Sequence, residues 1–225
     1  MQITELILRT NNISRQLRFY TGQLGMPGVH QSAESFSIRA GKSILTFQSQ
    51  NNPLPSVYHF AFNVATASLT GIPAFLDKND ISPIVADNVL IHEFTDWNAR
   101  AVYFKDPDGN ILEFIARFNL YPSDPVRAFS VEDIFSISEM GIVVYDLPGF
   151  VEVARKHLHQ DIWKEYGPDF KAIGDEEGLL ITVPPHRNWF PTNSPALPMP
   201  ASITLEREGL PLQYDQYHFT QQLLL

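Results

Sequence analysis

The chain has 225 residues, 44% of them hydrophobic, which is enough to bury one large core or two smaller ones. Its 16 Lys and Arg residues against 25 Asp and Glu residues give a net charge of −9, which argues against a nucleic acid or an anionic membrane as the main partner. The absence of cysteine excludes disulfides and thiolate metal sites, and no apolar run approaches the roughly 20 residues that a membrane helix needs.

The amino-terminal residues start at once on a strand-like pattern and lack the basic and apolar regions of a signal peptide, so we expect a cytoplasmic protein. Two later segments resemble this first strand, because each places a polar residue second and then turns apolar. The three predicted strands are residues 4–10, 58–64 and 138–144, and their polar second residues are Glu5, His59 and Glu139.

Amphipathic helices are predicted after the first and third of these strands, because apolar residues recur there at intervals of four, three and four. The two stripes are Ile13, Leu17, Tyr20, Leu24 and Leu147, Val151, Ala154, Leu158, with Asn12 and Asp146 as expected N-caps. A weaker helix is predicted at residues 68–79, where Pro73 is tolerable only in the first turn. Matching strands close the three units at residues 44–47, 111–114 and 180–183. This common order predicts three copies of one β-α-β-β-β unit.

The remaining segments lack clear periodicity. Residues 119–135 are interpreted as a linker, and residues 207–225 as a C-terminal tail that is poorly ordered from Asp215 onwards. The stretch 184–200 carries six prolines and should form an extended loop. Because residues 186–190 of this loop include aromatic and basic side chains, we expect it to lie over a surface.

Two motifs indicate a family. The segment Val102-Tyr-Phe-Lys-Asp-Pro-Asp-Gly-Asn-Ile-Leu-Glu113 and the helix pattern Phe19-Tyr-Thr-Gly-Gln-Leu-Gly25 resemble the vicinal oxygen chelate superfamily. That superfamily includes glyoxalases, type I extradiol dioxygenases, fosfomycin-modifying enzymes and bleomycin-binding proteins. The resemblance implies an α+β fold in which paired βαβββ modules form an open, cup-shaped sheet. It covers residues 1–118 as a two-module domain, with residues 136–206 as a third, unpaired βαβββ-like module.

The resemblance also implies a metal site, because the superfamily takes its ligands from the first and last strands of its modules. The matching positions are Glu5, Thr46, His59 and Glu113, of which Thr46 is a poor ligand. The predicted ligands are therefore Glu5, His59 and Glu113, a set that suits Fe²⁺ or Mn²⁺ and also permits Zn²⁺. Glu139 occupies the position of Glu5 in the third module, but with Thr182 it provides no complete site there. The alternative to a metal site is a purely structural role, in which His59 is a hydrogen-bonded core residue and Glu113 binds backbone amides.

Further site residues are implied around these ligands. Tyr103 stands ten residues before Glu113, where dioxygenases and fosfomycin-modifying enzymes carry a tyrosine that contacts the substrate; its alternative is a packed core aromatic. His92 is the candidate for the upstream histidine of dioxygenases, although it lies slightly too far from Tyr103 for that pattern. Trp97 and Arg100 precede the Tyr103 strand and could line the rim of the cup, or belong to an ordinary surface loop.

These expectations lead to two functional hypotheses. In the first, the chain is a metal-dependent enzyme, an isomerase, lyase or extradiol ring-cleaving dioxygenase, which binds two neighbouring oxygens of a small-molecule substrate. In the second, it is a metal-free binding protein of the bleomycin-resistance type. An unpaired third module would expose one face of its sheet, so a homodimer is a further possibility.

Overall fold

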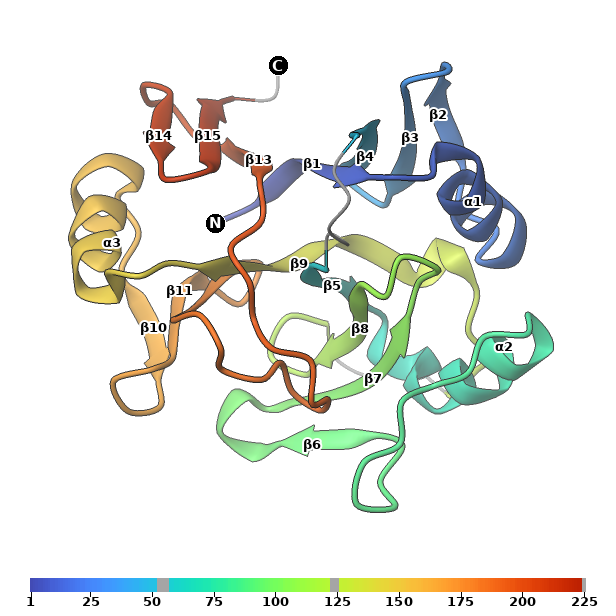
Figure 1. Cartoon of the computed structure of the whole chain (residues 1–225). Coiled ribbons are helices and arrows are strands. Elements are labelled where there is room, and N and C mark those ends of the chain that lie inside the picture. Colours follow the sequence, from blue (N-terminus) through green and yellow to red (C-terminus); the bar gives the residue numbers. More distant parts are fainter. Residues whose placement is uncertain (52–56, 122–125, 224–225) are drawn as a thin grey trace.

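The structure is a computed structural model that describes residues 1–51, 57–121 and 126–223. Within these residues, fifteen strands form one continuous open sheet, and the helices lie on its outer side (Figure 1). The mixed α+β class predicted from the sequence is confirmed. The sheet is built from four modules, which follow one another along the chain and share one pattern of strand pairing.

Module 1 sets this pattern. Its first strand pairs in parallel with its last strand, and a hairpin of two further strands continues from that last strand. The elements are β1 (Ile3–Thr10), α1 (Ile13–Leu17), the π-helical turn η1 (Arg18–Gln23), β2 (Gly28–Gln31), β3 (Ser35–Ala40) and β4 (Ser43–Ser49). The expected N-cap is present, since the Asn12 side chain accepts a hydrogen bond from the Arg15 amide. Tyr20 and Leu24 of the predicted stripe are buried.

Modules 2 and 3 repeat the pattern, with β5 parallel to β8 and β9 parallel to β12. Module 2 contains β5 (His59–Val64), η2 (Thr66–Gly71), α2 (Ile72–Lys78), β6 (His92–Phe94), η3 (Thr95–Trp97), β7 (Ala99–Lys105) and β8 (Ile111–Arg117). Module 3 contains η4 (Val131–Asp133), β9 (Ile134–Val143), α3 (Leu147–Val153), η5 (Ala154–Leu158), β10 (Ile162–Glu165), β11 (Lys171–Asp175) and β12 (Gly178–Val183). Pro73 lies in the first turn of α2, and the Asp146 side chain caps α3, as predicted.

A fourth, shortened module follows, in the region that the sequence analysis interpreted as the end of module 3 and a tail. It consists of β13 (Ala201–Glu206), β14 (Leu212–Tyr214) and β15 (Tyr217–Gln222). Because β13 is parallel to β15 and β14 is antiparallel to β15, the pattern of the other modules returns without its helix and with one strand fewer. Tyr217 and Phe219 are buried, and the backbone amide of Val143 donates to the Tyr217 hydroxyl at 2.8 Å. The described part of this region is therefore folded and is not a tail.

The pairing of the modules differs from the expected one. β5 of module 2 is antiparallel to β9 of module 3, and β1 of module 1 is antiparallel to β13 of module 4. Between β1 and β9 only one residue pair, Ile3 with Ile137, is in register. Each first strand has one free edge after pairing with its own last strand, and the fourth module takes the edge of β1. Module 3 is consequently paired and not unpaired, which removes the reason given for a homodimer, although the oligomeric state itself stays a prediction.

The two faces of the sheet carry different side chains. Along β8, Leu112 and Phe114 enter the main core beneath the helices, whereas Ile111 and Ile115 belong to a second cluster on the opposite face. This alternation confirms that Glu113 shares a face with Ile111. The second face of modules 2 and 3 lines a cavity, and we call these two modules together the site cup.

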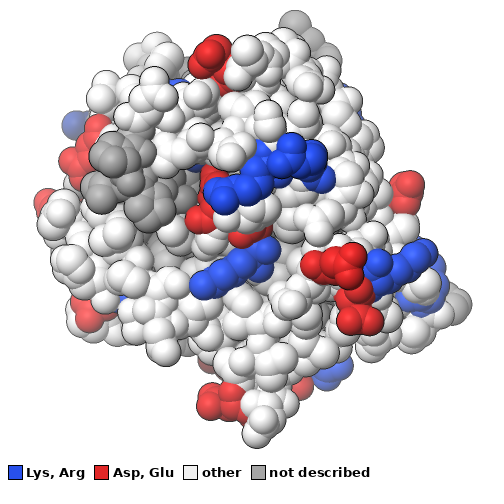
Figure 2. All heavy atoms as spheres, turned by 45° about the vertical axis from the view of Figure 1, so that its right-hand side comes forward, with Lys and Arg blue, Asp and Glu red and all other residues white. Residues whose placement is uncertain are grey.

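The charges on the molecular surface are mixed. On the face shown in Figure 2 most of the surface is uncharged, and the Lys and Arg side chains lie near Asp or Glu side chains without gathering in one basic patch. Among the described residues, no helix is long and apolar enough to cross a membrane.

Candidate metal centre

His59 begins β5 and is almost completely buried on the floor of the site cup. Its Nδ1 lies 3.2 Å from the carbonyl oxygen of Ile111, its register partner on β8. A carbonyl oxygen can only accept, so Nδ1 carries the proton. Burial lowers the pKa of His59 to about 4, which keeps the imidazole neutral near pH 7. The remaining ring nitrogen, Nε2, therefore presents a lone pair.

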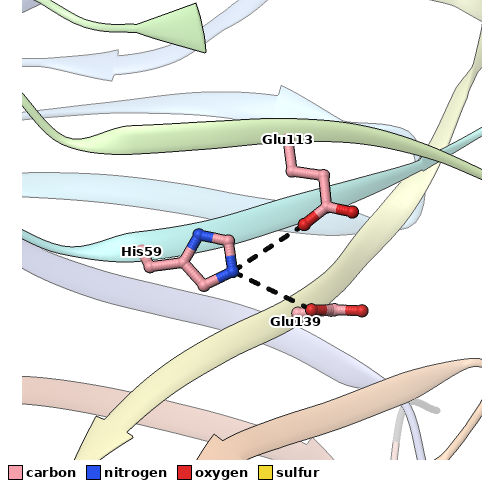
Figure 3. A group of neighbouring side chains, drawn as sticks. All are labelled: His59, Glu113 and Glu139. Atoms are coloured by element: carbon pink, nitrogen blue, oxygen red, sulfur yellow. Dashed lines mark ion pairs between the residues drawn. The ribbon is translucent and has the colours of Figure 1, made fainter. Parts of the chain in front are cut away.

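Glu113 and Glu139 face this lone pair from two strands (Figure 3). Ala61 of β5 is in register with Glu113 of β8 on one side and with Glu139 of β9 on the other. His59 lies two residues before Ala61, so its side chain emerges on the same face. Its Nε2 is 3.7 Å from Glu113 Oε2 and 4.0 Å from Glu139 Oε2. Three buried side chains from three neighbouring strands thus converge above one alanine.

The fourth equivalent position of the cup carries no ligand. Leu179 pairs with Glu139 as Ile111 pairs with His59, which places Ile181 at the position that corresponds to Glu113. The match of residues 180–183 with residues 111–114 predicts Thr182 at this position, and the observed register moves it by one residue. Ile181 lines the cavity of the site, and its apolar side chain leaves this side of the cluster without a protein ligand.

Arg117 supplies the positive charge next to the two carboxylates. It is fully buried at the end of β8 and donates to Glu139 Oε1, and also to the Ser138 hydroxyl at 3.3 Å. Its guanidinium lies 5.4 Å from the Trp97 ring and 5.8 Å from the Trp163 ring. Because Arg117 holds Oε1 of Glu139, the other oxygen of that carboxylate remains directed at His59.

The two carboxylates resist ionisation. Burial, followed by the charge of Glu139, raises the pKa of Glu113 well above its ordinary value, and Arg117 opposes the shift. Burial likewise raises the pKa of Glu139, again opposed by Arg117. One arginine therefore does not fully compensate two buried carboxylates, and a further cation next to them would stabilise their charged forms.

Tyr103 is the register partner of Glu113 on β7, so its side chain lies on the same face beside the Glu113 carboxylate. Burial, together with the neighbouring carboxylates, raises the pKa of Tyr103 well above 10, so the side chain stays a neutral phenol that can donate a proton in a hydrogen bond. The His92 ring packs on Tyr103 with the centroids 5.6 Å apart.

A cavity of about 490 Å³ opens above the cluster. The loop of residues 184–200 forms part of its wall, as expected for a loop that lies over a surface. Trp189 of this loop packs on His59 with the ring centroids 5.1 Å apart. Seven of the fifteen described residues that line the cavity are Phe, Trp or Tyr: Phe94, Trp97, Tyr103, Tyr166, Phe170, Trp189 and Phe190. Cavities with aromatic walls and a few convergent polar groups are typical of small-molecule sites.

The distances from His59 to the two carboxylates suit a divalent metal. The three candidate ligand atoms all lie within 4.8 Å of one another, and two atoms bonded to one ion at about 2.1 Å can be at most about 4.2 Å apart. The distances of 3.7 and 4.0 Å from His59 Nε2 satisfy this limit, yet both are too long for a hydrogen bond. An imidazole lone pair that faces two carboxylates without a hydrogen bond is the arrangement that a cation would stabilise.

The structure brings four of the predicted site residues to one cavity, namely His59, Glu113, Tyr103 and Trp97. Glu5 is not in the cluster, because β1 pairs with β13 and not with β5; Glu139 stands in its place. Arg100 is half-exposed, pairs with Glu93 at 3.4 Å and borders a separate shallow depression.

His92 does not line the cavity itself but packs behind two residues that do, Tyr103 and Phe190. Sequence reasoning did not count Glu139 among the candidate ligands, it did not single out Arg117, and it noted Arg187 only as part of a loop that lies over a surface. The equivalent positions of Glu5, His59 and Glu139 in their modules were the available signal for Glu139.

Comparisons with known proteins agree with the fold. No protein-family model and no curated protein matches the chain. A solved structure from Bacillus subtilis subsp. subtilis strain 168, named "putative dioxygenase", is 13% identical with a TM-score of 0.61, and the match covers 92% of this chain and 71% of that chain. A lactoylglutathione lyase from Agrobacterium tumefaciens is 20% identical with a TM-score of 0.43, covering 51% of this chain and 92% of that one. A glyoxalase/bleomycin resistance protein/dioxygenase from Nocardioides is also 20% identical, with a TM-score of 0.42 over 52% of this chain and 83% of that one.

The Bacillus likeness extends over nearly the whole chain. It confirms the fold that the resemblance to the vicinal oxygen chelate superfamily implied, with its βαβββ modules and open sheet. At 13% identity it shows the fold and not an activity.

Proposed function

We propose that this chain is a metal-dependent enzyme of the glyoxalase and dioxygenase type, in which His59, Glu113 and Glu139 bind one divalent ion. The observation that carries the proposal is the meeting of three proton acceptors. The Nε2 lone pair of neutral His59 faces Oε2 of Glu113 and of Glu139 at distances too long for hydrogen bonds. When the two carboxylates are ionised, these groups repel one another unless a cation lies between them.

The donor set suggests which ions would bind. One imidazole and two carboxylates suit Mn²⁺ or Fe²⁺ and also permit Zn²⁺. With both carboxylates ionised and Arg117 beside them, the protein groups would carry a net charge of about −1, which a divalent ion would convert to about +1. When bound, such an ion supplies Lewis acidity toward two neighbouring oxygens of a small substrate.

The protein's own groups have separate roles in this proposal. Tyr103 donates a hydrogen bond to, or orients, a substrate oxygen beside Glu113. Trp189 and the other aromatic walls of the cavity exclude water and hold a flat substrate. Arg117 holds Glu139 in its observed orientation and acts as a positioning residue. Isomerase, lyase and ring-cleaving reactions are all compatible with these roles.

The first experiment measures bound metal in the full chain by elemental analysis after purification without chelator. It compares the wild type with His59→Ala, Glu113→Gln and Glu139→Gln, and uses Glu5→Gln as the matched control. We expect about one equivalent of Mn, Fe or Zn in the wild type and in Glu5→Gln, and a loss of metal in the other three variants. A metal that is lost in Glu5→Gln but kept in Glu139→Gln would contradict the ligand set.

A thermal melt with and without added Mn²⁺, Fe²⁺ or Zn²⁺ gives a second readout. At 100 times its dissociation constant a bound ion stabilises the folded state by about 2.7 kcal/mol, a rise in Tm of roughly 5–10 °C for a chain of this size. The three ligand variants should lose this rise. If the wild type binds no metal and shows no shift with any of the three ions, the cup is a metal-free binding site of the bleomycin-resistance type.

A further inference from the structure

Arg187 stands apart from the other residues of the cavity. It is the only Lys or Arg among the described residues that line the cavity. Its guanidinium carbon lies 5.0 Å from the centroid of the Phe170 ring, which forms another part of the same wall. Among the described residues, no carboxylate lies within the 4.0 Å ion-pair distance of Arg187. A half-buried cation therefore borders the cavity without an ion pair, and Asp169 is the carboxylate whose charge acts on it from farther away.

The backbone that carries Arg187 is fixed by hydrogen bonds across its loop. The Ala196 amide donates to the Arg187 carbonyl at 2.7 Å, and the His186 amide donates to the Ala196 carbonyl at 2.9 Å. Two residues further on, the Trp189 amide donates to the Ser194 carbonyl oxygen at 2.9 Å. These bonds hold Arg187 close to Trp189, whose ring packs on His59. The backbone of Arg187 is therefore fixed before an anion binds, so that binding has to order only the side chain.

The cavity offers unused donors and flat walls between them. The buried indole Nε1 of Trp189 has no hydrogen-bond acceptor among the described residues. The Trp97 and Tyr166 rings are almost parallel, at 11° and with centroids 6.5 Å apart, and Phe170 lies next to both. A planar conjugated ring complements such walls, and an acceptor-rich ligand complements the donors.

We infer that Arg187 binds a carboxylate of the substrate, and that the substrate class is a planar aromatic acid with two neighbouring ring oxygens. The neighbouring oxygens rest on the proposed function; the carboxylate contact rests on Arg187 alone. A planar carboxylate matches the fork of a guanidinium with two parallel hydrogen bonds. A dianionic phosphate ester would need more positive charge than one arginine provides, and the cavity walls have no second Lys or Arg among the described residues.

The test uses 3,4-dihydroxybenzoate and its neutral analogue 3,4-dihydroxybenzamide, titrated into the Mn²⁺-loaded full chain by isothermal titration calorimetry. The wild type should bind the acid about tenfold or more tightly than the amide. Arg187→Gln should remove this preference, whereas Arg100→Gln, which changes an arginine outside the cavity, should retain it. Equal binding of acid and amide by the wild type, binding of neither, or an unchanged preference in Arg187→Gln would overturn the inference.

A second pair of probes separates this inference from the metal site. Benzoate and benzamide lack the neighbouring hydroxyls, and they are titrated into the metal-free wild type and Arg187→Gln. If the metal proposal fails and Arg187 acts as inferred, the metal-free wild type still binds benzoate more tightly than benzamide. Added Mn²⁺ then leaves the affinity for the dihydroxy compounds unchanged. If Arg187 does not bind the carboxylate, the preference for the acid is absent in both pairs, while any gain from Mn²⁺ remains.

Discussion

The substitution Gly141→Ala probes the contact that places Trp189 on His59. Gly141 lies on β9, and a Cβ built on it would come within 2.7 Å of Trp189 Cη2 and 2.9 Å of Cζ2. Carbon atoms pack at about 3.5–4.0 Å, so the indole would have to move by about 1 Å. Trp189 is 3% exposed, and we expect no free space to take up this shift without cost.

Overpacking of this kind typically costs about 1–3 kcal/mol. For a chain of this length the loss corresponds to a fall in Tm of roughly 2–12 °C. We expect the fall in a circular-dichroism melt, together with a change in tryptophan emission as the ring moves away from His59. Gly22→Ala is the matched control, because a Cβ at Gly22 would have no other atom within 4 Å.

A double-mutant cycle decides whether Trp189 is the cause. In a Trp189→Leu background the two clashing ring atoms are gone, so Gly141→Ala should cost clearly less than it does in the wild type. The same Cβ would also lie 3.1 Å from the His59 carbonyl oxygen. An equal loss of stability in both backgrounds would assign the effect to that backbone contact and refute the argument about the indole.

Three further predictions concern buried groups other than the candidate ligands. Arg117→Met breaks the buried pair with Glu139 and should destabilise the metal-free protein by about 3–5 kcal/mol in urea melts, with partial recovery in the double variant Arg117→Met/Glu139→Gln; a loss below about 1 kcal/mol would contradict the pairing. Burial raises the pKa of Asp106 from 3.8 to about 6, so folding takes up a proton and this group stabilises the fold below about pH 4, an effect that is lost as the pH rises through 6. The wild type should therefore gain up to about 3 kcal/mol over Asp106→Asn when urea melts are moved from pH 7 to pH 4, and parallel pH profiles would exclude the shift. Phe219→Ala should cost about 3–5 kcal/mol, whereas the exposed neighbour His218→Ala should cost little, and equal small losses would mean that β15 does not contribute to the core.

The local structure could be predicted from the sequence where one pattern was strong. The stripe from Ile13 to Leu24 and the stripe from Leu147 to Leu158 are amphipathic, and both segments are helical. The alternation along residues 111–114 likewise predicted that Glu113 lies on the face opposite Leu112 and Phe114, because adjacent strand residues point to opposite faces. These predictions depend only on neighbours along the chain.

The fourth module was not predicted because its strands are short and their sequence pattern is weak. Tyr217, Phe219 and Gln221 alternate with exposed residues, but a half-buried strand of six residues after a Gly- and Pro-containing stretch is hard to tell from a polar tail. It contains no helix, and so the strongest mark of the repeat is absent. A module that has lost its helix can still pair its first strand, and this is what β13 does with β1.

The choice of ligands follows from this pairing. Glu5, His59 and Glu139 occupy the same position on three first strands, and the sequence does not show which two strands will be neighbours. Once β13 occupies the free edge of β1, β5 pairs with β9, and the imidazole of module 2 meets the carboxylate of module 3. Thr46 of module 1 holds the position that Glu113 has in module 2, so the other half of the sheet lacks the carboxylate that would complete a second set. A domain boundary after residue 118 would therefore separate Glu139 from His59 and Glu113 and divide the site cup between its two modules, because the unit that carries the candidate chemistry joins modules 2 and 3.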